Sequence, residues 1–152
     1  MRTVDLCARR IREGHDPSRQ IDARLLIVAL SLLVRAAAME AAAIEQEDAA
    51  VRDRLEQARA RFDELVPGLS DARNVLTHFD EYARGHGRLQ RGDNDRAAAA
   101  RHFWGFGYDP ANGNIVLGPY QIDVEQAVVQ AHQLFTALYA AAQAVDRSRA
   151  AP

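Results

Sequence analysis

The sequence predicts an all-α fold, an antiparallel four- to five-helix bundle with a small β-hairpin inserted before the last helix. Three observations support this prediction. Four long segments repeat apolar residues at helical spacing, short breaks containing glycine and proline separate them, and one Asn-Gly pair lies between runs of aromatic and β-branched residues. The length of 152 residues is typical of a single domain, which we assign to the whole chain.

The composition excludes several classes of protein. With 48% hydrophobic and 26% charged residues, the chain is an ordinary globular one, neither disordered nor collagen-like. All 19 basic residues are arginine, and the net charge of −2 lacks the overall positive field of a nucleic-acid binder. The lone Cys7 cannot form an internal disulfide and belongs to no Cys/His cluster. We therefore expect no metal, no cofactor and a cytoplasmic location.

The N-terminal third should contain the central helix. Residues 1–16 are polar and are expected to lie at the periphery, and Asp16-Pro17-Ser18 is a cap-like entry into a helix that continues to about Ala43. Because almost every position after Leu25 is apolar, this helix belongs in the middle of the bundle. Its strongest apolar run, residues 25–34, is shorter than the roughly 20 residues that cross a bilayer, so we expect no membrane association.

Two further helices follow in the middle of the chain. The second is predicted from about Glu47 to Leu65 and ends at Pro67-Gly68. The third is predicted from about Asp71 to Arg84, capped by Ser70 with Asp71, and stops at the next glycines. Their apolar faces comprise Val51, Leu55, Ala58, Phe62 and Leu65 in the second helix, and Val75, Leu76, Phe79, Tyr82 and Ala83 in the third.

The remainder of the chain combines an insertion with the closing helix. Residues 85–118 are expected to form a loop and then a β-hairpin, whose two strands lie within 103–117 around the Asn112-Gly113 turn. The last helix is predicted from about Ile122 to Val145. It would bury its apolar face against the other helices and complete the core.

One polar constellation lies on the third helix. The sequence contains no Gly-rich phosphate loop, zinc spacing or nucleophile elbow. On a helix, however, Asn74 and His78 are four residues apart and share a face, and Arg73 lies one step round beside them. A guanidinium that neutralises a phosphorane, an imidazole that transfers a proton and an amide that orients the phosphate form a sufficient set for phosphodiester cleavage.

This segment resembles the HEPN family, whose members carry an arginine, four to six residues and then a histidine on a helix of an all-α bundle. Here the matching residues are Arg73, Asn74 and His78. The resemblance implies a homodimer in which two motifs face each other, and metal-independent cleavage of RNA to a 2′,3′-cyclic phosphate by a toxin or antiviral effector. It also implies an antitoxin or regulatory protein partner.

The residue after the arginine distinguishes this motif from other Arg-to-His pairs. Arg9, Arg10 and Arg96 also precede a histidine at the required spacing, but Asn, Asp or His follows none of them. Some family toxins carry a modifiable tyrosine two residues after the histidine. In this chain that position is Asp80, which argues against control by that modification.

Other interpretations remain open for the same residues. Arg73 could be a surface arginine paired with Asp71 or Thr77, and the helix could serve only a dimer or partner interface in a non-catalytic interaction module. In the arginine-rich stretch 84–101, the residues that could contact RNA are Arg84, Arg88 and Arg91. The alternative interpretation of this stretch is a solvated loop that binds no RNA. The aromatic residues of 103–108 are expected to pack within the hairpin.

Overall fold

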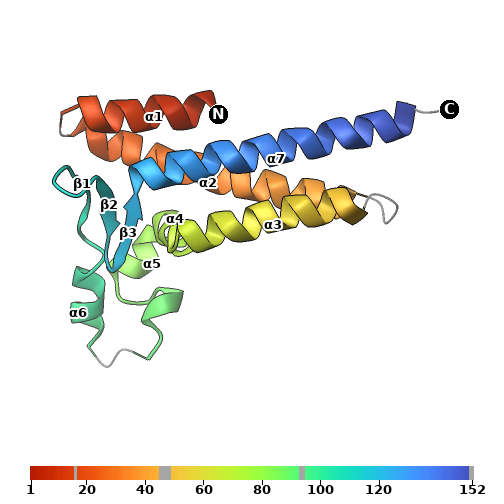
Figure 1. The fold of residues 1–152 in the computed structure, drawn as a ribbon. Coiled ribbons are helices and arrows are strands. Elements are labelled where there is room, and N and C mark those ends of the chain that lie inside the picture. The colour runs from red at the N-terminus through yellow and green to blue at the C-terminus, as the bar shows by residue number, and fades with distance from the viewer. Residues whose placement is uncertain (16, 45–48, 93–94, 151–152) are drawn as a thin grey trace.

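The computed structural model describes residues 1–15, 17–44, 49–92 and 95–150, which are mostly helical with a small three-stranded antiparallel sheet before the last helix (Figure 1). The prediction of a mainly α fold with a small β element at this point in the chain is therefore confirmed. The expected helix entry at Asp16 and the expected start at Glu47 lie outside the described residues.

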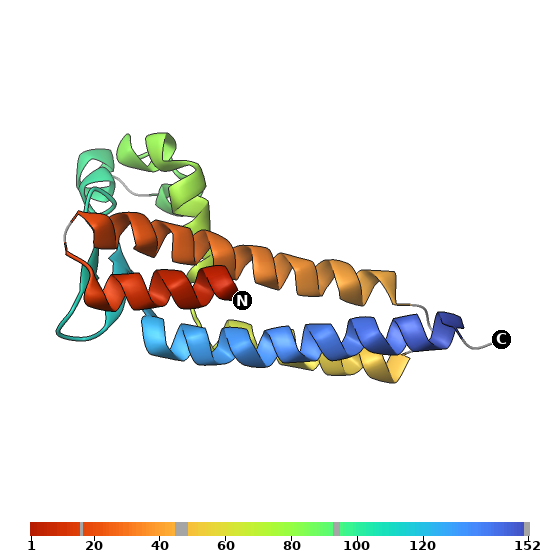
Figure 2. The ribbon, with the colours of Figure 1, turned by 90° about the horizontal axis from the view of Figure 1, so that it is seen from above.

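Three long helices contact one another: α2 (Ser18–Ala43), α3 (Ala49–Leu65) and α7 (Val124–Ala150). Helix α3 runs opposite to α2 and α7 (Figures 1 and 2). Helix α2 is long and apolar enough, by length and composition alone, to cross a membrane. In this fold it packs against four helices, α1 (Arg2–Glu13), α3, α4 (Leu69–Thr77) and α7, and 28% of its apolar window is buried.

The N-terminal segment differs from the expectation of a peripheral polar stretch. Residues Arg2–Glu13 form helix α1, which packs along α2. Its apolar side chains recur at helical spacing and are buried, while arginines occupy its other faces. Arg10 also reaches the buried carboxylate of Asp22 on α2, with Nε and Oδ2 3.2 Å apart. The buried residues of α1 are Val4, Cys7, Ala8 and Ile11.

The third predicted helix is not continuous. It begins at Leu69, ends at Thr77 as helix α4, and resumes as the short helix α5 (Phe79–Ala83). Between them, His78 has φ −116° and ψ 35°, outside the helical region. The expected continuous helix from Asp71 to Arg84 was therefore wrong at this one residue.

The insertion contains more structure than the predicted hairpin. After a 3₁₀ turn (Arg88–Gln90) and helix α6 (Arg96–Arg101), strands β1 (Phe106–Asp109), β2 (Asn114–Leu117) and β3 (Tyr120–Asp123) pair in the order β1-β2-β3. The turn at Asn112-Gly113 joins β1 to β2 as expected, with Gly113 at φ +71°. The third strand holds Ile122, which pairs with Ile115 instead of beginning the last helix.

Candidate functional site

The α4–α5 segment carries the three motif residues. Within the described residues, no side-chain hydrogen bond or ion pair connects any two of Arg73, Asn74 and His78, although the backbone N–H of His78 donates to the carbonyl oxygen of Asn74 at 3.0 Å. Arg73 and His78 are exposed, and Arg73 has no ion-pair partner in this part of the chain. The backbone bond keeps His78 one helical turn from Asn74, at the predicted spacing, but the side chains of the two residues have different partners.

Asn74 has a structural partner instead. Its side-chain amide donates a hydrogen bond to the hydroxyl of Tyr82, with 2.9 Å between Nδ2 and Oη. Tyr82 is completely buried, and its ring packs against Phe103 at a centroid distance of 5.0 Å. This hydrogen bond ties α4 to α5 across the break, so it gives Asn74 a role in positioning the segment.

The helix breaks where a threonine competes for its backbone. The hydroxyl of Thr77 donates to the carbonyl oxygen of Arg73, one turn earlier, at 2.9 Å. Such back-bonding by threonine bends helices, and here the chain leaves the helix at the next residue, His78. Thr77 thus contacts Arg73 through the backbone, and the arginine side chain stays unpaired among the described residues.

The histidine has an acidic partner in α5. Nδ1 of His78 lies 3.6 Å from Oε1 of Glu81, three residues later, and the two side chains are about half exposed, at 47% and 54%. The carboxylate can hold the imidazole ring in one orientation, which leaves Nε2 free to exchange a proton with solvent or a ligand.

A second polar group surrounds Tyr120 on β3. Burial raises the pKa of the Tyr120 hydroxyl, the nearby Asp71 and Tyr82 raise it further, and Arg88 opposes them. Arg88 lies over Asp71, with Nη2 and Oδ1 3.7 Å apart. Asp71, proposed from the sequence as a partner of Arg73, is therefore paired with Arg88.

The three candidate RNA-contacting arginines are all exposed but have different surroundings. Arg88 faces Asp71 on α4, whereas Arg91 lines a small pocket of about 190 Å³ together with His86 and Arg96. Arg84, the C-cap of α5, belongs to neither group. Arg96, from the same arginine-rich stretch, lies with one guanidinium nitrogen 3.4 Å from Nε2 of His86.

The aromatic residues of the insertion separate into two environments. Phe103 is buried against Tyr82 of α5 and also contacts Tyr120 of β3, so its ring packs outside the predicted hairpin. Trp104, by contrast, is 63% exposed, and its indole nitrogen donates to the carbonyl oxygen of Ala83 at 3.3 Å. Neither residue belongs to a strand, because β1 begins only at Phe106.

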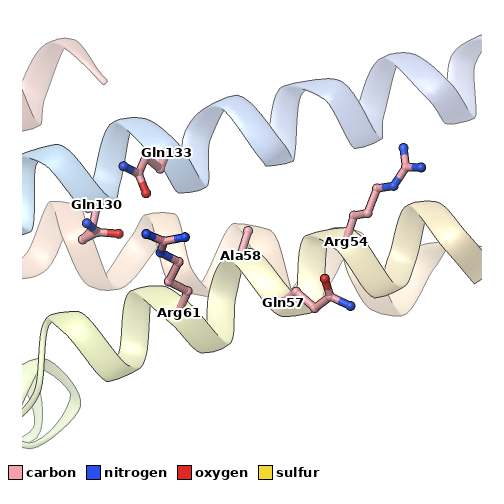
Figure 3. A pocket seen from close by; sticks show the side chains of 6 residues that line it. All are labelled: Arg54, Gln57, Ala58, Arg61, Gln130 and Gln133. Carbon is pink, nitrogen blue, oxygen red and sulfur yellow. The ribbon is translucent and has the colours of Figure 1, made fainter.

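A polar groove that sequence reasoning did not identify lies between α3 and α7 (Figure 3). Its volume is about 310 Å³, and in Figure 3 the side chains of Arg54 and Arg61 extend from α3 toward α7. Gln57, Gln130 and Gln133 also line it, together with Ala58. The only sequence signal is the seven-residue spacing that places both arginines on one side of α3.

Within the described ranges, no group of three or more His, Cys, Asp and Glu side chains could hold a metal ion. Comparisons with protein-family models, with curated proteins and with solved structures found no match to this chain.

Proposed function

We propose that the protein is a helical interaction module that acts as a homodimer through an apolar stripe on α2. The stripe comprises Ile21, Leu25, Val28, Leu32 and Met39, which are 45% to 65% exposed in the single chain. Intervals of four, three, four and seven residues place these side chains along one line of the helix, as in the seam of a coiled coil. This exposed line is the observation on which the proposal depends.

The stripe fits a second copy of itself in antiparallel alignment. When the two antiparallel α2 helices are aligned at Leu30, Val28 of one chain lies opposite Leu32 of the other, and Ile21 lies opposite Met39. These apolar pairs occupy the centre and both ends of a contact about 27 Å long. Arg35 fills the position between Leu32 and Met39. A parallel alignment would set Arg35 against its own copy, whereas the antiparallel one sets it against Leu25, whose surface its aliphatic stem can cover.

Replacing Leu32 with glutamate should dissociate this dimer. A charge in the centre of an apolar interface must be desolvated, so we expect the dissociation constant to rise at least tenfold, a loss of about 1.4 kcal/mol. Sedimentation-velocity ultracentrifugation of the full chain over a concentration series measures the change. Val129→Glu is the matched control, because Val129 is a similarly exposed apolar residue on α7 and the dimer should persist.

Two results would contradict the dimer. The first is a wild-type protein that stays monomeric at all accessible concentrations. The second is a Val129→Glu variant that dissociates as readily as Leu32→Glu. A lipid bilayer is the other apolar partner that could cover the stripe, and flotation with vesicles of mixed anionic and zwitterionic lipid tests it. If the monomer binds these vesicles and Leu32→Glu abolishes the binding, the stripe is a membrane contact and not a dimer interface.

A second candidate function is RNA cleavage by the dimer, and the observation in its favour is that Arg73 and His78 are both exposed and open to an incoming ligand. The HEPN-like motif supports the same chemistry. In this reaction the ribose 2′-oxygen attacks the adjacent phosphorus, the bond to the 5′-oxygen breaks, and a 2′,3′-cyclic phosphate remains. Arg73 stabilises the charge on phosphorus, and His78 takes the proton from the 2′-hydroxyl or gives one to the leaving oxygen.

Substitution of His78 tests this second candidate. Purified wild-type protein should cut single-stranded RNA in EDTA to cyclic-phosphate ends, and His78→Ala should reduce the rate at least tenfold, because general acid–base catalysis commonly contributes 10²-fold or more. His102→Ala, which removes another exposed histidine, should cut at the wild-type rate. RNA that stays intact with wild type, with and without EDTA, or equal cleavage by His78→Ala would exclude catalysis and leave the interaction module standing.

A further inference from the structure

The groove between α3 and α7 carries positive charge without a counterion among the described residues. Arg54 and Arg61 contribute two guanidinium groups, and no carboxylate is among its lining residues. Neither arginine forms an ion pair within the described part of the chain, although other arginines do, such as Arg10 with Asp22. A site with two permanent positive charges and no negative one attracts anions.

The side-chain amide of Gln130 also opens on this groove, and it makes no hydrogen bond to another described residue. The residue as a whole is only 5% exposed, but its amide nitrogen and oxygen are not shielded from solvent, so they are available to a ligand in the groove. Gln130 lies on α7 near the guanidinium of Arg61, and Gln133 lies on the next turn (Figure 3). Both can donate through their side-chain NH₂ groups.

We infer that this groove binds a small phosphate-bearing molecule with more than one anionic group. The first phosphoryl group occupies the space between Arg61, Gln130 and Gln133, where a guanidinium and two amides supply hydrogen-bond donors. Arg54 lies seven residues before Arg61, about 10 Å along the helix axis, and it receives a second anionic group of the same ligand.

The size of the site favours a small molecule over a nucleic acid. A volume of about 310 Å³ is at the lower end of the range of roughly 300–1,000 Å³ in which proteins hold small ligands. The donors come from two adjacent helices, and Arg61, Gln130 and Gln133 lie together on the two sides of this open groove. A nucleic-acid strand instead needs charges along an extended track.

Binding of polyphosphates to the full-length protein tests the inference. By isothermal titration calorimetry near physiological salt, tripolyphosphate should bind once per chain and at least tenfold more tightly than inorganic phosphate, because only the longer anion reaches both arginines. Arg61→Gln should weaken both anions at least tenfold. Arg54→Gln should abolish the advantage of tripolyphosphate and leave inorganic phosphate binding within about twofold, since salt screens the more distant charge.

Two controls separate this site from general attraction and from unfolding. Arg59→Gln removes the same charge from the same helix outside the groove, and tripolyphosphate affinity should stay within twofold. Gln130→Leu should weaken binding at least threefold without lowering the melting temperature, since the amide makes no hydrogen bond to another described residue that the substitution would remove.

Three outcomes would overturn the inference: no saturable binding of tripolyphosphate, equal weakening by Arg59→Gln and Arg61→Gln, or displacement of tripolyphosphate by a single-stranded RNA that binds more tightly through the same arginines. The last result would assign the groove to a nucleic-acid backbone. None of these results depends on whether the protein dimerises or cleaves RNA.

Discussion

Replacing Leu30 with alanine is expected to lower the free energy of unfolding by about 3 to 4 kcal/mol, because the side chain is completely buried in the core and its loss leaves a cavity. Leu30 lies in the middle of α2, the helix that contacts α1, α3, α4 and α7. Domains of this size are stable by about 5 to 15 kcal/mol, so one substitution here removes a large part of the total.

Urea denaturation followed by far-UV circular dichroism measures this loss. Leu6→Ala is the matched control, since Leu6 lies on helix α1 with 42% of its surface exposed and should cost well under about 1 kcal/mol. If the two variants lose stability equally, then α2 is not the centre of the core. In that case the exposed apolar stripe on α2 could not be regarded as an interface separate from the core.

The long helices could be predicted because their apolar residues follow a single period. In α3 the predicted apolar residues included Leu55 and Phe62, and the structure buries both. The signal for α1 was also present, because Val4, Cys7, Ala8 and Ile11 recur at intervals of three and four. The arginines in the same segment led to the prediction that it is polar and peripheral. A helix with one buried face, however, tolerates charge on all its other faces.

The sequence patterns predicted neither the third strand nor the helix break at His78. Tyr120–Asp123 follows Gly118-Pro119 directly and leads without a loop into α7, so its apolar residues looked like the first turn of that helix. At His78 no glycine or proline marks the break. The break coincides with two side-chain hydrogen bonds, from Thr77 to the Arg73 carbonyl and from Asn74 to Tyr82, which depend on tertiary packing.

The candidate sites show the same limit. The motif at Arg73, Asn74 and His78 was found from residue type and spacing, but spacing could not predict that Asn74 bonds to Tyr82 or that His78 lies beside Glu81, because both contacts depend on how α5 follows α4. Nothing in the sequence marks Gln130 or Gln133 as site residues. They lie near Arg61 because one particular side of α7 packs against α3. The packing of the whole core determines which side of α7 this is.

Replacing Gly87 with alanine is expected to cost about 3 kcal/mol, near the upper end of the usual cost of overpacking a core. A β-carbon at this position would lie 2.3 Å from Cδ1 and 2.5 Å from Cε1 of Tyr82, far inside van der Waals contact. The backbone of Gly87, with φ −61° and ψ 152°, is open to any residue, so the cost is one of space and not of backbone strain.

The space cannot be recovered cheaply, because the ring of Tyr82 is fixed on several sides. It is fully buried, it packs on Phe103, and its hydroxyl accepts the hydrogen bond from Asn74. Gly105→Ala is the matched control, since a β-carbon there meets nothing within 4 Å. Chemical denaturation of both variants gives the difference in stability, and near-UV circular dichroism reports the displaced tyrosine. A Gly87→Ala variant as stable as the Gly105→Ala variant would mean that Tyr82 can move aside, and the Asn74–Tyr82 hydrogen bond would then not hold α5 to α4 as we infer.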